Sequence, residues 1–162
     1  MEKTTSIDIL KLVISVLVCQ LAGFVGSIFT RVSVSSWYVS LSKPSFTPPS
    51  WVFGPVWITL YALIGISAFL VWSKEFNNRE VKAALIIFGI QLILNAFWSA
   101  AFFGLRSPLA GLIVIVILWL AILVTILRFL NISTAAGLLL VPYILWVSFA
   151  TVLNLSIFLL NK

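Results

Sequence analysis

Residues 107–127 read SPLAGLIVIVILWLAILVTIL and contain no charged side chain. A helix needs about 20 apolar residues, each rising about 1.5 Å, to cross a hydrocarbon core of about 30 Å. This stretch is therefore long enough and apolar enough to span a bilayer. Four further charge-free runs cover residues 12–30, 44–73, 83–105 and 129–161. The sequence predicts an all-α integral membrane protein built as a bundle of five transmembrane helices.

The composition supports the same fold class. Of 162 residues, 62% are hydrophobic and 9% are charged, against roughly 25% charged in an ordinary soluble domain. A soluble domain of this size could not hide so much apolar surface, which excludes a soluble enzyme and a disordered regulator. We expect one transmembrane domain over residues 1–162, with helices over about 7–30, 51–72, 80–103, 108–129 and 133–159. Pro142 lies inside the last span and should kink it.

Several kinds of chemistry lack the residues they need. The chain has no histidine, one cysteine and four acidic residues, and no pair of carboxylates lies in an apolar run. We therefore predict no metal site, no required cofactor and no carboxylate catalysis inside the membrane. The net charge of +6 comes from ten scattered basic residues. Scattered positive charge favours contact with lipid headgroups over nucleic-acid binding.

The loop between the first two spans, residues 31–50, is the long one. It contains Trp37, Lys43, Pro44, Pro48 and Pro49. Proline fixes φ and cannot continue a helix, so we expect this Pro/Trp-rich loop to be stiff and extended. Aromatic and basic residues also suit a membrane interface. Two interpretations remain open: an interfacial anchor, or a lid over a cavity between the helices.

Polar and aromatic residues share helix faces within the spans. The third span places Gln91, Asn95 and Trp98 on one face, and the fifth does the same with Tyr143, Trp146, Ala150 and Asn154. Amides are costly in a bilayer unless paired, so all three should point inward. They act either as interhelical hydrogen bonds or as the polar groups of an aromatic pocket.

The first span carries a face of small residues: Ser15, Cys19, Ala22 and Gly26. Small residues allow helix backbones to approach closely. This pattern favours tight packing within the bundle, with a dimer face or a cavity wall as the alternatives.

Four segments together resemble the translocator protein family (TspO/MBR), the tryptophan-rich sensory proteins. They are WYVSLSKPSFTPPSW at 37–51, PVWITLY at 55–61, QLILNAFWSAAFFG at 91–104 and PYILWVSFATVLN at 142–154. The resemblance implies a five-helix bundle, usually a homodimer, with a ligand cavity under the first loop. It implies binding of tetrapyrroles such as protoporphyrin IX, and of sterols in some members. The positions that match family pocket residues are Tyr38, Trp57, Asn95, Trp146, Ala150 and Leu153.

We therefore expect a membrane receptor or sensor that binds a porphyrin-type or related hydrophobic ligand. Trp57, Trp146 and Tyr143 could stack on or edge the porphyrin ring. Trp98, on the same helix face as Asn95, is a further predicted ligand-binding residue. Arg31 or Lys43 could pair with its propionates. Without histidine, free-base porphyrin is favoured over haem.

Two other functions stay open. In some bacterial relatives, the tryptophans matching Trp57 and Trp146 are tied to light-dependent porphyrin breakdown, which makes these two the candidate catalytic residues of an enzyme. The alternative is passive transport of tetrapyrroles or lipids. For location, we expect a multi-pass protein of a prokaryotic cell membrane.

The sequence departs from the family at three places. The tyrosine of the family's sterol-recognition segment is Leu155 here, so sterol binding is not favoured. An acidic residue of the fourth helix is replaced by Val114. The small-xxx-small dimer pattern of the third helix reads Ile86 and Ile90, so a homodimer has no local support.

Overall fold

A computed structural model describes residues 6–74 and 77–162 of the chain, and no strand occurs within those ranges. The elements in order are α1 (Ser6–Ser33), α2 (Trp37–Ser40), α3 (Ser50–Trp72), α4 (Arg79–Ser99), the π-helix η1 (Ala100–Gly104), α5 (Pro108–Ile132), α6 (Thr134–Leu139) and α7 (Val141–Leu160). Among the described residues, five helical spans are long and apolar enough to cross a membrane: α1, α3, α4 with η1, α5, and α6 with α7. The predicted five-helix membrane fold is confirmed.

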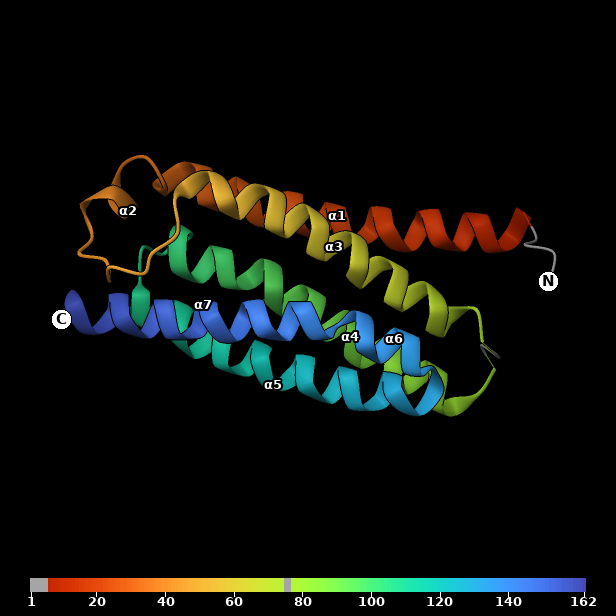
Figure 1. The fold of residues 1–162 in the computed structure, drawn as a ribbon. Coiled ribbons are helices and arrows are strands. Elements are labelled where there is room, and N and C mark those ends of the chain that lie inside the picture. The colour runs from red at the N-terminus through yellow and green to blue at the C-terminus, as the bar shows by residue number, and fades with distance from the viewer. Residues whose placement is uncertain (1–5, 75–76) are drawn as a thin grey trace.

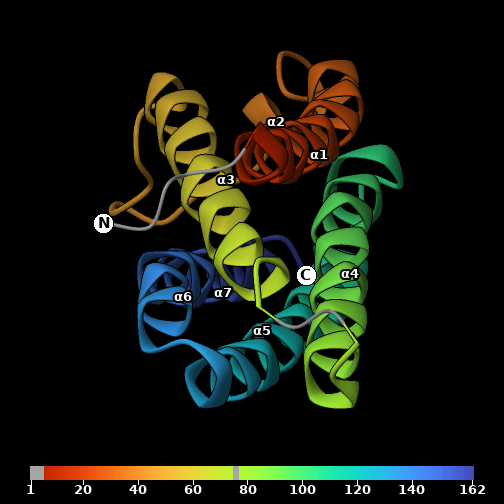
Figure 2. The same cartoon turned by 90° about the vertical axis from the view of Figure 1, so that its right-hand side faces the viewer.

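The five spans lie side by side in one elongated bundle (Figure 1). The first described residues of α1 lie at one end, and the C-terminus lies at the other end together with α2 and its loop. Viewed along its length, α1 packs against α3 and α4, α4 packs against α5, and α5 packs against α6 and α7 (Figure 2). The helix α3 closes the ring by contacting α6 and α7.

The outer surface of the bundle is apolar. Leu10 on α1, Ile86 and Ile93 on α4, and Leu145 on α7 are each more than half exposed. An apolar surface of this extent would be unfavourable in water, but it is the surface that lipid tails require. The protein is thus a multi-pass integral membrane protein. Ile86, which the family resemblance places in a dimer pattern, is one of these outward side chains.

Small residues let α1 approach its neighbours closely. A Cβ placed on Gly65 of α3 would lie 2.6 Å from the Cα of Val16, and one on Gly26 of α1 would lie 3.1 Å from the Oγ of Ser99. Ser15 and Cys19 on the same face of α1 are buried. The small-residue face therefore serves tight packing inside the bundle, as the favoured interpretation predicted.

The fifth span is interrupted where Pro142 predicts a kink. The helix α6 ends at Leu139, Leu140 forms a turn, and α7 begins at Val141 with the proline in its first turn. A proline is tolerated at this position because the first N–H groups of a helix have no intrahelical acceptor.

The third span differs from the prediction of one helix over 80–103. The regular α-helix ends at Ser99, and the backbone then widens into η1. Its hydrogen bonds join residues five apart: Leu105 N donates to Ala100 O at 2.9 Å, and Ser107 N donates to Phe102 O at 3.2 Å. The wider turn brings Phe102 and Phe103 into the core, where both are buried.

The prediction of an extended loop over 31–50 is wrong in its first half. The helix α1 continues to Ser33, and Trp37–Ser40 form a helical turn, α2. The prolines stand after this turn, so they do not prevent it. Residues 41–49 contain no helix, as the three prolines predict.

A candidate ligand cavity at the α2 end of the bundle

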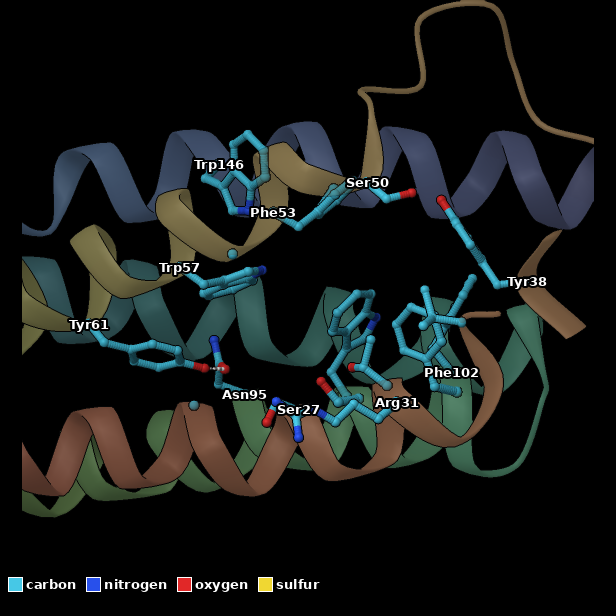
Figure 3. A pocket seen from close by; sticks show the side chains of 18 of the residues that line it. Ser27, Arg31, Tyr38, Ser50, Phe53, Trp57, Tyr61, Asn95, Phe102 and Trp146 are labelled. Carbon is cyan, nitrogen blue, oxygen red and sulfur yellow. Dashed lines mark hydrogen bonds between the residues drawn. The ribbon is translucent and has the colours of Figure 1, made fainter. Parts of the chain in front are cut away.

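A cavity of about 640 Å³ opens at the end of the bundle that carries α2. Its wall is built by α1, α2, α3, α4, η1 and α7, so segments far apart in the sequence meet around one space (Figure 3). Its volume falls within the range of about 300–1,000 Å³ that is usual for small-molecule sites. The predicted ligand-binding residues that line it are Tyr38, Trp57, Asn95, Trp98, Trp146, Ala150 and Leu153.

Nine of the 24 lining residues are aromatic. Trp57 stacks on Tyr61 with ring centroids 5.4 Å apart, and Trp98 stacks on Phe102 at 5.7 Å. Phe53 meets Trp146 edge to face at 5.9 Å. The rings of Trp57 and Phe102 lie on opposite sides of the open space (Figure 3). A wall of this kind suits a flat, largely apolar ligand that can pack against ring faces and edges.

A buried polar cluster closes the inner end of the cavity, and we call it the floor network: Tyr61, Gln91, Asn95 and Tyr143. The Tyr61 hydroxyl donates to Oδ1 of Asn95, and Nδ2 of Asn95 donates to the Tyr143 hydroxyl at 2.8 Å. That hydroxyl in turn donates to Oε1 of Gln91 at 2.9 Å. The network joins α3, α4 and α7. The predicted inward orientation of Gln91 and Asn95 is confirmed, because both are almost fully buried.

Two of the predicted pocket groups are thus engaged in interhelical bonds. Asn95 lines the cavity, yet both of its polar atoms already have partners in the floor network. Tyr143 does not line the cavity at all. It is fully buried behind Trp57, whose ring it meets edge to face at 6.3 Å. The prediction that Tyr143 would stack on a ligand is therefore corrected to a supporting role.

The third inward amide, Asn154, lies at the cavity edge and is buried. Its Oδ1 accepts from Trp98 Nε1 at 3.3 Å, and its Nδ2 donates to Pro108 O at 2.8 Å. These bonds fix the Trp98 indole and tie α7 to the start of α5. This amide, too, holds helices together.

Two indole N–H groups in the wall are not used by the protein. Trp146 Nε1 is buried and has no hydrogen-bond partner, and Figure 3 shows this edge of the indole turned toward Trp57. Trp57 Nε1 also bonds to nothing within the described ranges, and its nitrogen points into the open space in the same view. A buried donor without a partner is costly, but Trp146 Nε1 is closed off from the cavity, so a ligand acceptor could pair with it only after the indole shifts. Trp57 Nε1 is the donor that a ligand acceptor can reach directly.

The outer end of the cavity is covered by α2. Tyr38 lines the cavity and packs on Phe103 at 5.6 Å, while Trp37 meets Phe102 edge to face at 5.5 Å. Burial raises the pKa of Tyr38, so its hydroxyl stays protonated and remains a donor at neutral pH. These ring contacts hold α2 over the opening and favour the lid interpretation of the loop over an interfacial anchor.

The other predicted lid residues act at a distance from the cavity. Lys43 donates to three backbone oxygens, those of Tyr38 at 2.7 Å, Leu41 at 3.0 Å and Val39 at 3.3 Å. It therefore caps the end of α2. Pro44, Pro48 and Pro49 are not among the lining residues; they carry the chain from α2 back to α3.

Sequence reasoning missed part of the wall. Phe53, Gln20 and Gly23 line the cavity and were not among the candidates. The sequence shows Gly23 only as a small residue of α1. Glycine is needed there because a Cβ would overlap the ring of Tyr61 on α3. No pattern within α1 signals a contact with a side chain 38 positions away.

Comparison with known proteins identifies relatives over nearly the whole chain. The model of the TspO/MBR family matches residues 15–160. Tryptophan-rich protein TspO from Archaeoglobus fulgidus is 49% identical over 155 residues, which is 95% of this chain and 99% of the relative. Its namesake from Chlorobaculum tepidum is 47% identical over 154 residues, or 95% and 98% of the two chains. Translocator protein from Homo sapiens is 40% identical over 137 residues, or 83% and 80%.

Proposed function

We propose that this chain, which belongs to the TspO/MBR family, is a membrane receptor or sensor for a porphyrin-type tetrapyrrole or a related hydrophobic ligand. Members of the family include proteins named for sensory and translocator roles. The ligand occupies the cavity under α2. The observation that carries the proposal is the cavity itself: about 640 Å³, walled by Trp, Tyr and Phe rings, with two unused indole donors.

The match between cavity and ligand rests on shape and polarity. A free-base porphyrin is a flat aromatic plate, and the rings of Trp57, Trp98 and Phe102 offer faces on which it can pack. Of its four ring nitrogens, the two without a proton can accept a hydrogen bond, and Trp57 Nε1 is a donor that faces the open space. No cofactor is required for this binding. Relatives in a bacterium and an archaeon favour a prokaryotic cell membrane as the location.

The test is an equilibrium titration of protoporphyrin IX in the dark, read by tryptophan quenching with an inner-filter correction. Ala150 lines the cavity, whereas Val152, on the same helix, faces outward and is 54% exposed. Ala150→Phe should fill the space that the ligand needs and weaken binding about tenfold or more, a loss of at least about 1.4 kcal/mol of binding free energy. Val152→Phe adds similar bulk outside the cavity and should bind like the wild type. Identical, non-saturable quenching in all three proteins would mean that porphyrin only partitions into the micelle.

A second candidate is a light-dependent enzyme, favoured by Trp57 and Trp146 both lining the cavity. A photoexcited porphyrin could take one electron from an indole, which leaves an indole radical cation and a porphyrin radical anion. Addition of dioxygen to the reduced porphyrin ring would then begin its breakdown. Passive transport has less support, because the bundle beyond the floor network is filled by buried side chains such as Ile64, Val71 and Ile122. A homodimer stays a prediction of the family resemblance.

A further inference from the structure

Among the described residues that line the cavity, Arg31 is the one with a formal charge. It stands in the last turn of α1, at the α2 end of the bundle. Its guanidinium forms no hydrogen bond or ion pair with any other residue in 6–74 and 77–162. Asp8 stands in the first turn of α1 and Glu80 in the first turn of α4, both at the opposite end. Among the described residues, Arg31 is thus a cation at the edge of an aromatic cavity without an anion paired to it.

The other cations at this end are engaged elsewhere or do not reach the cavity. Each of the three ammonium protons of Lys43 has a backbone carbonyl within hydrogen-bond distance, so it has no donor to spare. Arg106 turns its Nε toward Ser33 Oγ at 3.4 Å, and it is not a lining residue. Lys162 lies over the Phe158 ring at 5.1 Å and does not line the cavity either.

The inner part of the wall offers one neutral donor that faces the open space, Trp57 Nε1, and no positive charge. The floor network has no formal charge and Gln91 Nε2 in it has no partner, and the remaining surface is mainly apolar. A carboxylate buried there would have one neutral donor at most and no cation, which is strongly unfavourable. The favoured place for an anionic group of a ligand is therefore near Arg31, whose planar guanidinium can take a carboxylate through two parallel hydrogen bonds.

We propose that the cavity recognises one anionic group of its ligand, held by Arg31, and a flat neutral body that extends from there toward the floor network. This inference rests on the proposed function and narrows the ligands to amphiphiles that bind Arg31 through one carboxylate. A second carboxylate, if the ligand has one, stays in water beside the first at the opening and adds no affinity. Ligands with anionic groups at opposite ends are excluded.

The test compares protoporphyrin IX with its monomethyl and dimethyl esters, in the dark and in a non-ionic detergent. Each compound is titrated into the wild type, Arg31→Gln, Arg31→Lys and the charge-matched control Lys162→Gln. The quantity of interest is the ratio of Kd between variant and wild type for one compound, since this ratio cancels differences in partitioning among the compounds.

Arg31→Gln should raise the Kd of the diacid and of the monoester by about tenfold each, as expected for loss of one charge-assisted hydrogen-bond pair, and should leave the diester unchanged. In the wild type, the monoester should bind within about twofold of the diacid, the statistical factor for losing one of two equivalent groups. Arg31→Lys should restore part of the affinity, and Lys162→Gln should change none of the three.

Two outcomes would overturn the inference. One is a monoester that responds to Arg31→Gln no more than the diester does, which would mean that both carboxylates are needed. The other is an equal loss for all three compounds, which would mean that Arg31 acts through the fold. Failure of the proposed function gives a different result, which the diester reports because it has no carboxylate to pair with Arg31. In that case the diester would bind without saturation, or Ala150→Phe would leave its Kd unchanged.

Discussion

Nδ2 of Asn95 donates a 2.8 Å hydrogen bond to the hydroxyl of Tyr143, and this bond ties α4 to α7 directly beneath the cavity. The same hydroxyl donates onward to Gln91 at 2.9 Å. The hydrocarbon around the bundle offers no alternative partner for any of these groups. The floor network therefore sets the depth of the cavity while it holds three helices together.

Removing the hydroxyl at the centre of this network should cost stability and spare ligand affinity. Tyr143→Phe leaves Asn95 Nδ2 without its acceptor and Gln91 Oε1 without its donor. Interhelical hydrogen bonds in membranes average about 0.6 kcal/mol with a maximum near 1.7, so a loss of about 1–2 kcal/mol is expected for two of them. The measurement is the apparent Tm in detergent, followed by a porphyrin titration.

The matched control for that variant is Thr151→Val on the same helix. The Thr151 hydroxyl donates only to Val147 O of its own helix at 2.7 Å, so its loss should leave the Tm nearly unchanged. A large loss of porphyrin affinity in Tyr143→Phe, at unchanged Tm, would contradict the supporting role and return Tyr143 to the ligand site.

Two glycines should respond to the same substitution in opposite directions. Gly65→Ala places a methyl group 2.6 Å from the Val16 Cα, so α1 and α3 must separate, at a cost of about 1–3 kcal/mol. A Cβ placed on Gly89 of α4 would meet no neighbouring atom within 4 Å, so Gly89→Ala should gain up to about 1 kcal/mol from helix propensity. Apparent Tm values of the two variants test this. Equal shifts in the two would contradict the close approach of α1 to α3.

The five spans were predictable because a bilayer imposes its length and polarity on a single helix, so charge-free runs reveal them one at a time. The inward amides follow from the same rule, since an amide facing lipid has no partner. Ala150 and Leu153 in the cavity wall came from the family resemblance, because neither residue type signals a pocket by itself.

Features that depend on several helices at once were not predictable. The π-turn at Ala100–Gly104 serves to bury Phe102 and Phe103 against α2 and α7, and nothing in AAFFG itself specifies a wider turn. Tyr143 looked like a pocket residue because it shares a face with Trp146. Only the packed bundle shows that Trp57 stands in front of it.

Lys43 should control how fast a ligand leaves. Lys43→Met keeps the length of the side chain and removes three hydrogen bonds to the end of α2. The turn that carries Trp37 and Tyr38 should then open more often, so the dissociation rate constant should rise severalfold while the Tm changes little. Stopped-flow displacement of bound porphyrin measures this rate. Lys162→Met removes a cation at the same end and should leave the rate unchanged; an equal rise in both variants would point to surface charge instead of the lid.

Illumination should distinguish a receptor from a light-driven enzyme. If indoles of the wall donate electrons to a photoexcited porphyrin, then Trp57→Phe and Trp146→Phe should each slow the oxygen-dependent loss of porphyrin absorbance, because phenylalanine is far harder to oxidise. Saturable binding in the dark should persist because phenylalanine keeps the ring contact, with Trp57→Phe weaker only by the lost indole N–H. Trp119→Phe is the matched control: its Nε1 donates to Ser148 Oγ at 2.7 Å on the α5–α7 side, and it does not line the cavity. Loss of absorbance at the same rate in all four proteins would mean that the bleaching is the porphyrin's own photochemistry, and the receptor function would stand without an enzymatic one.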